Sequence, residues 1–273
     1  MELKHKVRNS SLAHVFLSFG IGMISQEARH MLVDPQSSHN AFNQSSTPAD
    51  GMTMLHLAAL WTGHEEDFGL ILDKYRNLIN GQTRNKKKTA LHFAVERGDP
   101  RMVKRLLMEE ELDPNLQDTV HQAPLNKAIL GEETEVVRLL LNDRRVDPMT
   151  QNSQGNTPLH RAANAGRQNL VRLLLDDKRV DPNVRNAGLE TPLHRAIRAG
   201  HAECVSLILA HRLVDREEQW RFGLTPYDLA LNSNNPDIIY LLARGPEERS
   251  ERTKLLWEVD DDDPEYQFRR DEF

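Results

Sequence analysis

The chain has 273 residues, of which 38% are hydrophobic and 28% are charged, and its formal net charge at pH 7 is −6. It contains a single cysteine, Cys204, which excludes an intramolecular disulfide framework. This composition predicts a soluble protein of the cytoplasm, the nucleus or both.

Residues 1–49 carry two competing patterns. Asp34-Pro35 stands 24 residues after Ser10, a spacing that recurs further along the chain. We therefore expect a degenerate N-terminal capping repeat, because the end of a repeat array needs a polar outer face. The alternative is a signal peptide, since three basic residues precede the apolar stretch Val15–Ile24. That stretch has no small-x-small cleavage site after it and is too short to span a bilayer.

A Thr-Pro-Leu-His pattern recurs between residues 50 and 245. It is perfect in two copies, and four imperfect copies extend the series in both directions. The copies begin at Thr53, Thr89, Ala123, Thr157, Thr191 and Thr225, so the first spacing is 36 residues and the other four are 34. A fixed period of this length predicts one supersecondary unit stacked on copies of itself.

Each copy predicts two short helices followed by an extended loop. The first residue of a copy is position zero, where Thr is a good N-cap, and the Pro that often follows it has no N–H to leave unsatisfied. An apolar residue at +2 and Ala at +5 mark the buried face of the first helix. Val or Ile at +14 and apolar pairs at +17 and +18 mark the second helix, and Asp-Pro at +24 ends it.

Thr-Pro-Leu-His-x-Ala, a following Gly, Val-x-x-Leu-Leu and Asp-Pro-Asn together resemble the ankyrin repeat. The resemblance implies an all-α solenoid of helix–loop–helix–hairpin units that binds partners with its hairpin tips and concave helix face. The copy that begins at Ala123 departs most, and Asp228 replaces the histidine in the last copy, which suits a terminal capping unit. The expected repeats are 50–85, 86–119, 120–153, 154–187, 188–221 and 222–245, with the cap at 1–49 before them and an acidic, disordered tail at 246–273 after them.

The repeated histidines are not expected to bind a metal. The residues of the structural motif are Thr53, His56, Thr89, His92, Thr157, His160, Thr191, His194 and Thr225. Successive copies of a position lie about 10 Å apart in packed helices, whereas zinc ligands converge to ~2 Å from one ion. We expect these histidines to hydrogen bond within and between neighbouring loops. No phosphate-binding loop or nucleophile elbow occurs, so we expect no catalytic, metal or cofactor site and no enzyme activity.

Seven residues outside the repeat framework are candidate partner contacts. They are Trp61, Lys127, Arg161, Arg195, Trp220, Phe222 and Trp257. Large aromatic side chains outside core positions are typical interface anchors, although Trp61 could instead pack against the N-terminal cap. The three cations share position +4 and predict a basic ridge for an acidic partner or for the acidic tail. The alternative is a solvated face on which they form salt bridges with neighbouring repeats.

Residues 246–273 hold all of the net charge, with 11 acidic and 5 basic side chains. Residues 1–245 are therefore neutral, with 30 of each, which argues against direct binding of nucleic acid. The run Asp260–Asp263 lies among large apolar residues, as in acidic activation segments. The alternatives are a solubilising tail and a final helix, Ser250–Val259, lying on the last repeat. A second charged cluster, Lys86–Lys88 with Arg84, predicts either a nuclear import signal or a solvated hairpin tip.

These patterns predict a non-catalytic scaffold that binds another protein, is monomeric on its own and contacts neither nucleic acid nor membrane directly. The more specific interpretation is a regulatory adaptor or transcriptional coregulator that acts through a DNA-binding partner. One alternative is a cytosolic scaffold or inhibitor that masks a partner enzyme. Another is an enzyme built on the repeat frame, which would need a pocket of convergent polar groups that the sequence does not indicate.

Overall fold

The computed structural model describes residues 51–60, 65–233 and 235–243. All regular secondary structure in these residues is helical, which confirms the predicted all-α fold class. The expected N-terminal cap, the acidic tail, Trp61 and Trp257 lie outside the described residues. None of the helices that can be described has the length and apolarity needed to cross a membrane.

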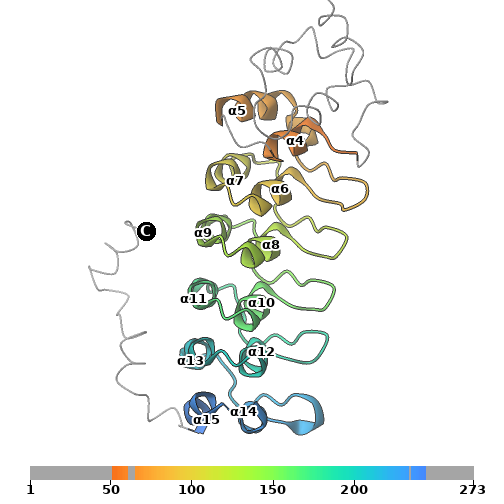
Figure 1. Cartoon of the computed structure of the whole chain (residues 1–273). Helices are drawn as coiled ribbons and strands as arrows, with labels where there is room; N and C mark the ends of the chain where they lie inside the picture. The colour runs from red at the N-terminus through yellow and green to blue at the C-terminus, as the bar shows by residue number, and fades with distance from the viewer. Residues whose placement is uncertain (1–50, 61–64, 234, 244–273) are drawn as a thin grey trace, which may run out of the picture. The chain divides into compact units, whose positions relative to one another are not determined.

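The described helices fall into two compact units that are divided between Ser153 and Gln154. In the first unit, α4, α6 and α8 form one row in chain order, and α5, α7 and α9 form a second row (Figure 1). Each repeat therefore contributes one helix to each row. The helices are α4 (Met54–Leu60), α5 (Glu65–Lys74), the 3-10 turn η2 (Arg76–Leu78), α6 (Ala90–Glu96), α7 (Pro100–Leu107), α8 (Pro124–Gly131) and α9 (Thr134–Asn142).

The second unit repeats this arrangement. Its first row is α10, α12 and α14, and its second row is α11, α13 and α15. A 3-10 turn, η3, precedes the last pair of helices. The helices are α10 (Pro158–Asn164), α11 (Gln168–Asp176), α12 (Pro192–Ala199), α13 (Ala202–Ala210), η3 (Arg221–Gly223), α14 (Pro226–Ser233) and α15 (Pro236–Ala243).

Threonine caps fix where the first helix of a repeat begins. Thr157 and Thr191 have an extended backbone, and their side-chain oxygens accept the N–H of the residue three positions later. The helix ends with a left-handed residue, which is Gly200 (φ 77°) after α12. After α8 the left-handed residue is Glu132 (φ 62°), because Gly131 lies one position too early and forms the last residue of that helix.

Alanine at +5 lets neighbouring first helices approach closely. Ala162, Ala196 and Ala230 of the second unit are all 0% exposed, as is Ala94 of the first unit. The leucine at +2 is buried as well, and Leu193 is 1% exposed. Protein interiors have few gaps, so a larger side chain at +5 would overpack the contact between helices.

Asparagine side chains tie successive loops together within each unit. In the first unit, Asn115 donates to the carbonyl of Arg145 (2.7 Å) and accepts the N–H of Asp147 (2.8 Å). In the second unit, Asn183 makes the same two bonds with Leu213 (2.6 Å) and Asp215 (2.8 Å). The Asp-Pro-Asn sequence therefore does more than end the second helix, because its asparagine also satisfies backbone groups of the next repeat.

Candidate functional site

The repeated histidines are fully buried, and His92 and His160 use both of their ring nitrogens. Nδ1 of His160 accepts the backbone N–H of Thr157 (3.2 Å) and lies 2.8 Å from the hydroxyl of the same threonine. Because Nδ1 accepts a hydrogen bond from an N–H, the ring proton is on Nε2, which donates to the carbonyl of Glu190 (2.9 Å). In the first unit, His92 makes the equivalent bond to the carbonyl of Gln122 (2.9 Å). Neither ring nitrogen of His160 or His92 is left for a metal ion.

His160 and His194 are neutral at physiological pH. Burial lowers the pKa of His160 to about 4, against the opposing effect of its hydrogen bond to Glu190. Burial likewise lowers the pKa of His194 to about 4 and lowers that of His92. Across the described residues, no group of three or more His, Cys, Asp or Glu side chains could hold a metal ion.

Lys127 of the first unit forms ion pairs within that unit. Its ammonium group lies 3.3 Å from Glu96 and 3.6 Å from Asp118. Lys88 also pairs with Glu96 (2.6 Å). Two carboxylates of the preceding repeat thus pair with Lys127, which agrees with the alternative of salt bridges between neighbouring repeats. Its role in partner binding stays a prediction.

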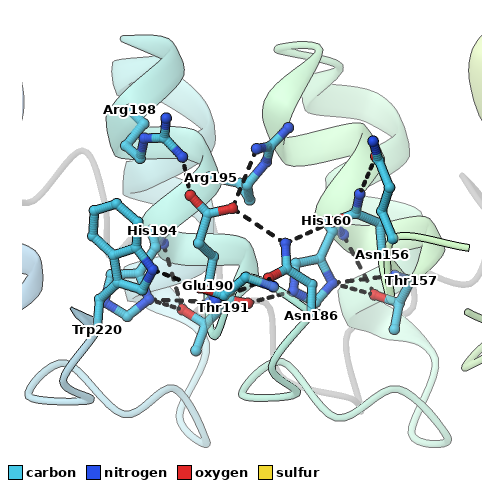
Figure 2. Close-up of polar contacts among 12 residues, drawn as sticks. Asn156, Thr157, His160, Asn186, Glu190, Thr191, His194, Arg195, Arg198 and Trp220 are labelled. Atoms are coloured by element: carbon cyan, nitrogen blue, oxygen red, sulfur yellow. Dashed lines mark hydrogen bonds and ion pairs between the residues drawn. The ribbon is translucent and has the colours of Figure 1, made fainter.

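In the second unit, several side chains converge on the buried carboxylate of Glu190, which is 4% exposed (Figure 2). Arg195 pairs with it at 3.2 Å, and Arg198 pairs with its other oxygen. The guanidinium of Arg198 also lies over the Trp220 ring, 5.2 Å from the centroid. The indole N–H of Trp220 donates to the carbonyl of Gly188 (2.8 Å). We call Glu190, Arg195, Arg198 and Trp220 the Arg–Trp cluster.

Asn186 holds the loop that presents Glu190. Its side-chain oxygen accepts the N–H groups of Gly188 (2.8 Å) and Glu190 (3.0 Å). Its amide donates to the Glu190 carboxylate (3.2 Å) and to Asn156 (2.8 Å). Burial acts to raise the pKa of Glu190, but the hydrogen bonds from Asn186 and Arg198 and the nearby arginine charges hold it below its usual range. Glu190 is therefore ionised and fixes the positions of both arginines.

The structure brings only some of the predicted partner contacts together. Arg195 and Trp220 meet in the Arg–Trp cluster, while Arg161 is half-buried on α10. Phe222 lies in η3, but its side chain is not among those described. Each of these assignments stays a prediction as far as partner binding is concerned.

Glu190 and Arg198 are absent from the contacts predicted from the sequence. They occupy positions −1 and +7 of their repeat, which hold different residues in the other copies. One signal was available, because Arg195 and Arg198 are three residues apart on a predicted helix and therefore share a face.

Comparisons with known proteins agree with the repeat pattern. A family model described as "Ankyrin repeats (3 copies)" matches residues 23–118, 91–186 and 178–251. The crystal structure of an ankyrin repeat domain from Acinetobacter baumannii AYE matches with a TM-score of 0.61 and 26% identity, covering 69% of this chain and 95% of that one. The comparison with curated proteins finds no match. The first family match begins inside the segment where we expect the degenerate cap.

Proposed function

Because the chain belongs to the ankyrin-repeat family, we propose that it is a non-catalytic scaffold that binds another protein through the Arg–Trp cluster. Ankyrin repeats generally mediate protein–protein interaction. One observation is the reason for choosing the Arg–Trp cluster as the binding surface. The side chain of Arg198 is held between Glu190 and Trp220 and yet remains 47% exposed.

A fixed and exposed arginine beside a tryptophan suits the centre of an interface. Arg and Trp are enriched among the residues that contribute most to binding energy. A side chain that is already ordered also loses less conformational entropy when a partner binds. Trp220 is itself positioned by its hydrogen bond to Gly188, so the two contact groups keep their relative geometry before binding.

The charge around the cluster favours an acidic partner. The first-row helix α12 carries Arg195 and Arg198 and no acidic residue. Glu190 can neutralise only one of these charges. An acidic segment of a partner would therefore meet an excess of positive charge on this face, which favours its association.

Two observations support a role without catalysis. Burial raises the pKa of the Cys204 thiol to about 11, so this thiol is a poor nucleophile. At His92 and His160 both ring nitrogens form structural hydrogen bonds, so neither of these two side chains is available as a general base.

Affinity purification with the full-length protein tests the proposed surface. We expect Arg198→Ala to weaken binding of the recovered partner about thirtyfold, equivalent to ~2 kcal/mol. The matched control is Arg172→Ala, which removes an exposed arginine from α11 of the same unit. If both variants bind the partner as tightly as the wild type does, the interface lies elsewhere. The same holds if both variants lose affinity by the same factor.

We further propose that the partner links the scaffold to transcription, so that the protein acts as a regulatory adaptor or coregulator. The acidic segment 246–273 supports this proposal, as does the basic turn at residues 84–88. Arg84, Lys86 and Lys87 are exposed in that turn, and Lys87 has a φ of 50°.

Fusion of residues 246–273 to a DNA-binding domain should activate a reporter. No activation, together with a strictly cytosolic full-length protein, would contradict this proposal, and recovery of an enzyme as the partner would favour a masking role.

A further inference from the structure

The outer face of the last repeat exposes large apolar side chains. Tyr227 and Leu231 of α14 are 40% and 47% exposed, and Tyr240 of α15 is 55% exposed. Helix α15 has the apolar sequence Ile-Ile-Tyr-Leu-Leu at its centre, but among its side chains only Ile238 is buried. We call Tyr227, Leu231, Ile239, Tyr240 and Leu242 the end face.

The equivalent positions in the preceding repeat are covered. Leu193 and Ile197, which correspond to Tyr227 and Leu231, are 1% and 0% exposed. Val205 and Ile208 correspond to Ile239 and Leu242 and are fully buried. In the last repeat, after which no further repeat is described, Tyr227 and Leu231 are exposed and Ile239 and Leu242 are half-buried.

The residues of the end face are not those of a solvent-facing cap. A repeat that ends an array replaces apolar residues on its outer side with polar ones. Asp228 alone suits such a unit, but four outward positions stay apolar here. At a fifth position the change even runs from polar to aromatic, because Tyr240 occupies the position of Ser206 in the preceding repeat. The end face therefore has the composition of an interface between repeats.

We infer that residues 250–259 of the same chain dock on the end face as a capping helix. Helix α15 ends at Ala243, and Gly245 and Pro246 then favour a helix stop and a turn. Leu255, Leu256 and Val259 would share one face of a helix. The ten-residue segment would be about 15 Å long, which matches the ~12 Å of the eight-residue helix α15.

This occupant is favoured because it is joined to the end face by a short segment. Residues 244–249 would form a six-residue connection, within the usual length of links between packed helices. A second copy of the protein would have to pay the entropy of association to cover the same surface, whereas a tethered segment does not. The docked helix would also hold the acidic run Asp260–Asp263 next to the last repeat.

Hydrogen exchange of the full-length protein tests the inference. The test variant is Leu255→Asp/Leu256→Asp, and the matched control is Tyr266→Asp/Phe268→Asp, which adds the same charge beyond the proposed helix. We expect amides of α15 to exchange about tenfold faster in the test variant and at the wild-type rate in the control. Amides of α13 should keep their protection in both, which shows that the repeats remain folded.

Two outcomes would overturn the inference. Unchanged exchange of α15 in the test variant would mean that residues 250–259 do not cover the end face. A concentration-dependent dimer in the wild type that the test variant abolishes, seen by sedimentation, would identify a second copy as the occupant. The end face contains none of the residues of the Arg–Trp cluster, so neither outcome bears on the proposed partner surface.

Discussion

Two successive histidines in the second unit have the same cap but different contacts with the next loop. Nδ1 accepts the threonine N–H at 3.2 Å for His160 and at 3.0 Å for His194. Nε2 of His160 then donates to the carbonyl of Glu190, whereas buried Nε2 of His194 has no hydrogen-bond partner among the described residues. The identical sequence Thr-Pro-Leu-His thus produces two different links between repeats.

The difference arises in the following loop. Before α12, Asn186 organises the loop through bonds to Gly188 and Glu190. Trp220 occupies the same register position before α14, and that loop contains the 3-10 turn η3. The cap is therefore encoded inside one copy, while the link between copies depends on the loop of the next one. A buried unpaired donor also makes the last link weaker than the one before it.

Both of these contacts between repeats depend on close packing of the first-row helices at the alanines of position +5. Ala162→Arg should lower the free energy of unfolding by more than about 4 kcal/mol, because a charged side chain has no room and no partner at a fully buried position. Urea denaturation followed by circular dichroism measures this loss. The control is Ala165→Arg at the exposed C-cap of the same helix, which should change stability by less than ~0.5 kcal/mol. Equal losses would mean that +5 is not the packed position.

Acid should weaken the repeats through the neutral histidines. The pKa of His160 is about 4 in the folded state against an ordinary value of 6.5, so between these values only the unfolded state binds the proton. Stability should therefore fall as the pH drops from 6.5 to 4, by about 3 kcal/mol for this residue.

His160→Asn removes the titrating imidazole but keeps a hydrogen-bonding side chain at this position. Asparagine suits the position, because Asn126 occupies it in the third repeat and donates to Thr150 (3.0 Å). Urea denaturation at several pH values should show a shallower loss of stability below pH 6.5 in the variant than in the wild type. The same slope in both proteins would show that His160 does not titrate with this shift.

Removing each histidine compares the two links directly. His160→Ala should cost about 2 kcal/mol more than His194→Ala, because only His160 bonds to the next loop and only His194 carries an unpaired buried donor. Both variants lose the same bond from the threonine N–H to Nδ1, so this loss cancels in the difference between their unfolding free energies. An equal cost would mean that Nε2 of His194 finds a partner in solution.

The sequence predicts what recurs and misses what occurs once. The threonine caps, the buried alanines and the helix pairs follow from the period, because each is repeated at a fixed position. Glu190 and Arg198 do not, because no pattern in a single sequence pairs Glu190 with Arg198 or Arg198 with Trp220. The division after Ser153 is equally hidden, since the 34-residue spacing continues across it.

Trp220 has two roles that one substitution can separate. Trp220→Phe keeps an aromatic ring over which Arg198 can lie but removes the indole N–H that donates to Gly188. We expect a loss of about 1 kcal/mol in stability, the usual contribution of one hydrogen bond. Hydrogen exchange should place this loss in α14 and α15, because the Trp220 loop leads into the last repeat. If exchange in α10 and α11 rises equally, Trp220 supports the whole unit, and the last link is no weaker than the one before it.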